Sequence, residues 1–124
     1  MPLTARLRDE ENERINNLLK RLIGMDYVPE NGNEFINEVL KGLGLSLQLL
    51  LDLSPEAMIL HLQKFNFDWA NAEQFADFLT ALSTKLPEDR FALTNKAIAI
   101  YSYIQKESKT FSFTIAGKIT AAKS

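Results

Sequence analysis

The stretch from Leu43 to Leu62 has the highest density of hydrophobic side chains in this 124-residue chain. A signal for the start of a helix, Ser54-Pro55-Glu56, interrupts it. The Ser54 hydroxyl can accept a hydrogen bond from a first-turn N–H, Pro55 has the φ of a first helical residue, and Glu56 suits the helix dipole. Leucine also favours helix over strand. We therefore expect two short helices that meet at a corner, and not a membrane-spanning helix, which would need about 20 uninterrupted apolar residues.

Apolar residues recur at helical spacing along the rest of the chain, which predicts an all-α fold. We expect five to seven helices in successive antiparallel hairpins, within a single domain that spans residues 1–124. The N-terminal helix is predicted over residues 4–23, and a second helix is expected to begin near Asn33. A helical-hairpin array is predicted over residues 54–122.

Two local signals set the expected boundaries within this array. Asn71, with Gln74 three residues later, is interpreted as a capping box that opens a helix reaching about Lys85. Pro87, followed by two acidic residues, predicts the start of the next helix. The segment 110–122 fits a helix, but its first residues alternate as in a strand. Helix is preferred because the chain offers no second convincing strand to pair with it.

The helix starts at Pro55-Glu56 and Pro87-Glu88 are 32 residues apart, and each is expected to open a helix–turn–helix unit. Asn95–Tyr101 looks like the second helix of a tetratricopeptide repeat, in which an alanine and an aromatic residue recur on the packing face. Over about residues 70–122 the chain thus resembles tetratricopeptide-like helical-hairpin proteins, and in overall layout it resembles small uncharacterised bacterial all-α proteins. The resemblance implies a fold and no activity.

Composition limits the classes of function. The chain has no cysteine, which excludes disulfides, zinc–thiolate sites and thiol catalysis and is compatible with a reducing compartment. The N-terminus carries several charged residues before any apolar run, so we expect no secretory signal. These observations predict a cytoplasmic protein that has no contact with a membrane.

Charge is distributed unevenly along the chain. Residues 24–84 carry nine acidic and two basic side chains, whereas residues 85–124 carry three acidic and seven basic ones. The basic residues near the C-terminus are spread along helices and form no stripe, so a nucleic-acid partner is not expected. An acidic middle and a basic end instead suit a protein partner or self-association.

No pattern of residues predicts a catalytic site, a bound cofactor or a metal. His61 is the only histidine, and it has neither further metal ligands nor a nucleophile pattern beside it, so we interpret it as a boundary side chain with a polar tip. Two carboxylate pairs, Glu34 with Glu38 and Glu73 with Asp77, lack the Glu-x-x-His partner of di-iron bundles and are expected on solvated helix faces.

The predicted function is therefore a non-enzymatic protein-interaction module or adaptor, with a groove lined by the helices at 71–85 and 88–106. Trp69 is expected to pack over the core, and Tyr103 to be more exposed than Tyr101. The possible interaction surface comprises Trp69, Tyr101, Tyr103, Glu73 and Asp77. Two alternatives are a homo-oligomeric structural protein and a small-ligand-binding regulator with a pocket near His61 and Trp69.

Overall fold

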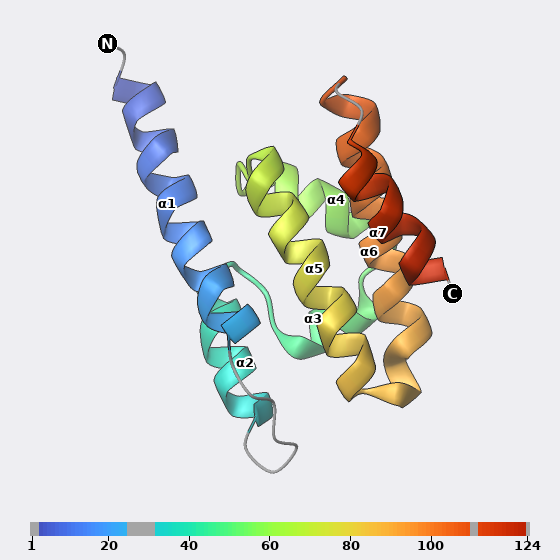
Figure 1. Cartoon of the computed structure of the whole chain (residues 1–124). Coiled ribbons are helices and arrows are strands. Elements are labelled where there is room, and N and C mark those ends of the chain that lie inside the picture. The colour runs from blue at the N-terminus through green and yellow to red at the C-terminus, as the bar shows by residue number, and fades with distance from the viewer. Residues whose placement is uncertain (1–2, 25–31, 110–111, 124) are drawn as a thin grey trace.

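The computed structural model describes residues 3–24, 32–109 and 112–123, with side chains from Glu10 onward (Figure 1). These residues form seven α-helices and one short 3-10 helix, and no strand occurs among them. The all-α prediction is confirmed, as is helix over strand within 113–122, while Thr110 and Phe111 lie outside the described residues. The helices are α1 (Leu3–Gly24), α2 (Gly32–Lys41), α3 (Leu47–Asp52), α4 (Pro55–Lys64), α5 (Trp69–Lys85), η1 (Pro87–Asp89), α6 (Arg90–Glu107) and α7 (Phe113–Lys123).

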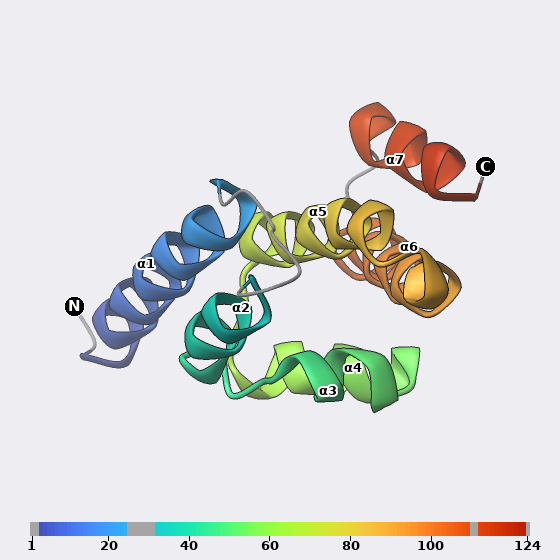
Figure 2. The ribbon, with the colours of Figure 1, turned by 90° about the horizontal axis from the view of Figure 1, so that it is seen from below.

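Helix α5 lies at the centre of this arrangement. It packs against α6 as an antiparallel hairpin on one side and against α1 on the other (Figure 2). Helix α7 covers the α5–α6 hairpin from one side, and α3 and α4 lie against α6 from the opposite side. Successive helices thus pack as hairpins.

The core follows from the apolar faces predicted by helical periodicity. Helix α5 contributes the most buried side chains, and the alanines at 72, 76 and 97 let α5 and α6 approach closely. The fully buried larger side chains are Tyr101, Phe75, Ile15, Leu19, Leu22, Ile36, Leu40, Leu43, Leu50, Met58, Leu62 and Leu79.

The predicted corner at Ser54-Pro55 is confirmed. The Ser54 Oγ accepts a hydrogen bond from the Ala57 N–H at 3.1 Å, and α4 begins at Pro55. Ser46 caps the preceding short helix in the same way, accepting from the Leu49 N–H at 3.2 Å. Polar caps therefore divide the leucine-rich stretch into two helices.

The predicted capping box at Asn71 is wrong. Asp68 is the N-cap of α5, and its Oδ1 accepts from the Asn71 N–H at 2.8 Å. The Asn71 side chain is buried and reaches across to α1, where its Nδ2 donates to the Asn12 carbonyl oxygen at 2.9 Å and to Oδ1 at 3.0 Å. One turn later, the Gln74 Nε2 donates to the Asn16 Oδ1 at 2.7 Å. These amides fix the register of α1 on α5, because a shift would leave buried polar groups unpaired.

Candidate functional site

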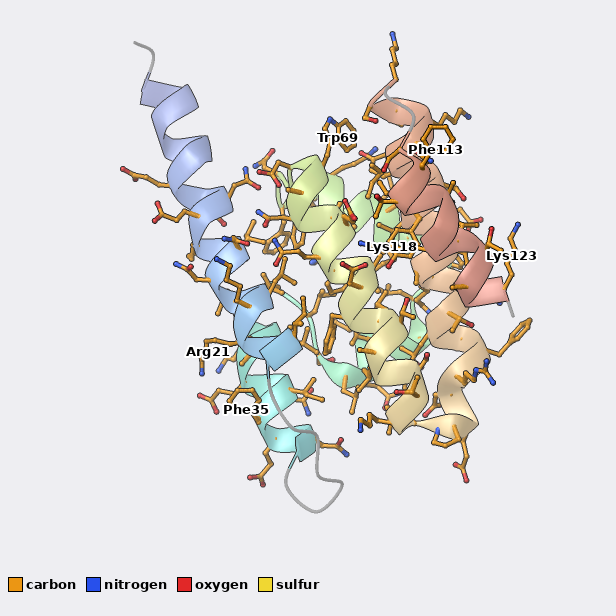
Figure 3. The ribbon with its side chains drawn as sticks, in the orientation of Figure 1. Arg21, Phe35, Trp69, Phe113, Lys118 and Lys123 are labelled. Carbon is orange, nitrogen blue, oxygen red and sulfur yellow. The ribbon has the colours of Figure 1, made fainter. Side chains whose placement is uncertain are left out.

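Three of the predicted surface residues meet in one cluster between α5, α6 and α7. The Tyr101 hydroxyl donates to the Asp77 Oδ1 at 2.5 Å, and Tyr101 is only 2% exposed. The Lys118 Nζ lies 2.5 Å from the Glu73 Oε2 and 3.1 Å from an Asp77 carboxylate oxygen (Figure 3). We call these four residues the Lys118 cluster.

The environment of the Lys118 cluster shifts two pKa values. Burial raises the pKa of Tyr101 well above its ordinary value, and the neighbouring Asp77 carboxylate raises it further. Burial alone would lower the pKa of Lys118, but its hydrogen bonds to Glu73 and Asp77 leave that pKa raised. The Lys118 ammonium therefore remains charged at neutral pH, and its ion pairs with Glu73 and Asp77 join α7 to α5.

The predicted solvated face is correct for Glu34 and Glu38, which are exposed, and wrong for Glu73 and Asp77, which are half-buried. The cause is a tertiary contact between helices. Helix α7 lies over the second pair and brings Lys118, more than 40 residues away in sequence, between the two carboxylates.

Trp69 is 42% exposed, so its predicted packing over the core is wrong. It is the first residue of α5, at the end of the molecule, and its ring contacts Tyr103 with 5.6 Å between ring centroids (Figure 3). Tyr103 is half-buried and accepts a hydrogen bond from the Gln63 Nε2 of α4 at 3.2 Å, so it is more exposed than Tyr101, as predicted. The structure separates the Trp69–Tyr103 pair from the Lys118 cluster.

His61 is a half-buried boundary residue, as predicted. Its Nε2 lies 2.8 Å from the Leu43 carbonyl oxygen, and its ring stacks on Phe65 with 4.4 Å between centroids. Four cavities are described on the surface, and neither His61 nor Trp69 lines any of them.

Two of these cavities adjoin each other where α5 ends, α6 begins and α7 ends. Their volumes are about 420 and 530 Å³, and both are lined by Pro87, Arg90, Thr94 and Ala122. We call the combined depression the end groove. It lies between the two helices that the sequence predicted to form a groove, but α7 supplies a wall that sequence reasoning missed. Its other lining residues are Thr80, Ser83, Thr84, Glu88, Phe91, Asn95, Ile98, Ala121 and Lys123.

The end groove places an exposed hydroxyl, that of Thr84, beside an apolar wall. The hydroxyls of Ser83, Thr84 and Thr94 each donate to a backbone carbonyl of their own helix, at 2.6 to 2.9 Å, and Ser83 and Thr94 are buried. A hydroxyl that donates in this way still offers oxygen lone pairs as acceptors. Phe91, which is 78% exposed, lies on the wall of the groove. This combination suits a segment of polypeptide that brings N–H groups and apolar side chains.

No protein-family model, curated protein or solved structure matches this chain. In the described ranges, no helix is long and apolar enough to cross a membrane. Over the same residues, no group of three or more Asp, Glu or His side chains is placed to hold a metal ion.

Lys96 is the one charged side chain that is fully buried among the described residues, at 3% exposure. Its Nζ has only distant carbonyl partners, Leu51 O at 3.4 Å and Ala92 O at 3.5 Å. Burial lowers the pKa of Lys96, and the charge of Asp52 opposes this shift only in part. The charged form is therefore less stable in the folded protein than in the unfolded chain.

We expect Lys96→Met to raise the free energy of unfolding at pH 7 by about 1 kcal/mol, because methionine fills similar space without a buried charge. The folded-state pKa lies below the unfolded value, so the wild-type protein loses this penalty as pH rises through the folded pKa. The advantage of the variant should therefore shrink at alkaline pH, as measured by urea denaturation of both proteins from about pH 7 to 10. An advantage that grows with pH would contradict this account.

Proposed function

We propose that the chain is a non-enzymatic protein-interaction module that binds a segment of a partner protein in the end groove. The observation that carries the proposal is the exposed Phe91 ring on the wall of a groove about the size of a few side chains. Exposed aromatic side chains beside a concave surface are favoured anchors for protein partners. The tetratricopeptide-like character of the C-terminal half belongs to the same proposal, since stacked hairpins present concave binding surfaces.

The charged residues that line the end groove indicate which side chains a partner segment would carry. Arg90 and Lys123 line the end groove together with a single carboxylate, that of Glu88. An acidic side chain near an apolar one would complement this surface, since opposite charges at an interface favour encounter and register. The proposed module acts in the cytoplasm, in keeping with its lack of cysteine.

The test compares two phenylalanines that are both strongly exposed. Phe91 lies on the end groove, whereas Phe113, 86% exposed, lies at the opposite end of α7 and outside the groove. Tagged wild-type, Phe91→Ala and Phe113→Ala proteins are used for quantitative affinity capture from the native cell. We expect a partner whose recovery falls about tenfold or more with Phe91→Ala and is unchanged with Phe113→Ala, as for an anchor residue.

Both substitutions remove an exposed ring, so neither should alter folding, which circular dichroism can verify. Equal recovery of every captured protein with Phe91→Ala and wild type would contradict the proposal. So would a parallel loss with both variants, because that would indicate nonspecific capture by exposed rings.

A further inference from the structure

Helix α7 buries few of its own side chains on the α5–α6 hairpin. Ile115 is the only buried residue of α7, Ile119 is half-buried, and Phe113 is exposed. Polar contacts add to these: the Lys118 bridge to Glu73 and Asp77 of α5, and two hydrogen bonds of 2.9 Å between the Gln105 side chain of α6 and the Ser112 backbone. A helix with a single buried side chain opens more readily than the core helices.

After α6 ends, Lys109 has an unfavourable backbone conformation. Helix α6 ends at Glu107, and Lys109 has a φ of +58°. A lysine in this left-handed region is strained, because its Cβ crowds the backbone. The other described non-glycine residue with positive φ is Asn66, a residue type that tolerates this conformation through local hydrogen bonds. Lys109 therefore stands out as strained.

Separation of α7 from the hairpin would remove this strain, because Lys109 could then adopt an ordinary conformation. The surface that α7 covers would be left with two carboxylates that have lost their lysine, and with the Tyr101 ring, whose centroid lies 5.9 Å from the Lys118 Nζ. The helix that best fits this surface is an identical α7, with its lysine and two isoleucines at the same spacing. Exchange of a whole helix between copies preserves its contacts and changes only the connection.

We propose that two copies of the chain associate by exchanging α7, so that each α7 lies on the α5–α6 hairpin of the other copy. In the exchanged dimer, Lys118 of one copy bridges Glu73 and Asp77 of the other. The α7 wall of the end groove then also comes from the other copy, although the proposal does not depend on that groove. Short connections give effective concentrations of the order of millimolar, and strain at Lys109 lowers the protein concentration needed for exchange. We expect dimers at roughly 0.1–1 mM protein.

The first test uses two substitutions that both remove the lysine side chain. Lys109→Gly relieves the strain, whereas Lys109→Ala retains it, because alanine is also disfavoured at positive φ. Analytical ultracentrifugation of the purified proteins should show wild type and Lys109→Ala dimerising with similar Kd. The Kd of Lys109→Gly should be about tenfold higher, as expected for relief of strain in two hinges. Wild type and Lys109→Ala that both stay monomeric at about 1 mM would overturn the proposal.

The second test identifies the surface by mixing two charge-reversed proteins. Lys118→Glu and Glu73→Lys each place like charges together when α7 stays on its own hairpin. In an exchanged heterodimer, the glutamate introduced at position 118 of the first protein meets the lysine introduced at position 73 of the second, and the other interface is native. The mixture should dimerise several-fold more strongly than either protein alone. If the mixture dimerises no more strongly than either protein alone, the dimers use another surface and the proposal is overturned. The same holds if Lys109→Gly leaves the dimer Kd unchanged.

Discussion

Replacement of Gly44 by alanine is expected to lower the free energy of unfolding by about 3 kcal/mol. Gly44 has a φ of +72°, where an alanine is strained. A Cβ at this position would overlap the Phe65 Cζ and lie 3.0 Å from both Cε atoms of that ring. The ring cannot move away easily, because it stacks on His61, whose Nε2 lies 2.8 Å from the Leu43 carbonyl oxygen. Domains of this size have total stabilities of roughly 5–15 kcal/mol, so the loss would be large.

Urea denaturation followed by circular dichroism measures this loss. Gly117→Ala provides the matched control, since a Cβ there meets no atom within 4 Å and the residue lies inside α7. That substitution should leave stability unchanged or raise it by about 0.5–1 kcal/mol, through the better helix propensity of alanine. A Gly44→Ala protein with a wild-type denaturation midpoint would show that the corner between α2 and α4 is packed differently.

Much of the fold could be predicted because its signals are local. Helical spacing of apolar residues and the Ser54-Pro55 start describe interactions within a few residues of each other, and both predictions are confirmed. The sequence predicts the wrong start for α5 because Asp68 and Asn71 are both good N-cap residues, three positions apart. Which of the two residues is the N-cap depends on Asn12 of α1, because Asn12 accepts hydrogen bonds from the Asn71 side chain. Pairings of this kind are invisible in a local pattern.

The candidate sites were harder to predict from the sequence, because they depend on tertiary contacts. The missing Glu-x-x-His partner predicts a solvated face for the Glu73 and Asp77 carboxylates, yet Lys118 lies between them. Part of the charge asymmetry between the middle and the end of the chain is therefore balanced within the molecule. The end groove needs three helix ends to meet, which no periodicity predicts. An exposed aromatic residue just after a helix start, as at Phe91, was the one signal that could have pointed to it.

Site-specific photo-crosslinking tests most directly whether the end groove binds a partner. A photoreactive residue at Asn95 lies in the groove, whereas one at Glu107 lies at the other end of the same helix, and both positions are exposed. We expect a crosslinked partner from position 95 in the native cell, little or none from position 107, and loss of the product when Phe91→Ala is added. Equal crosslinking from both positions, or crosslinking from position 107 alone, would contradict binding in the end groove.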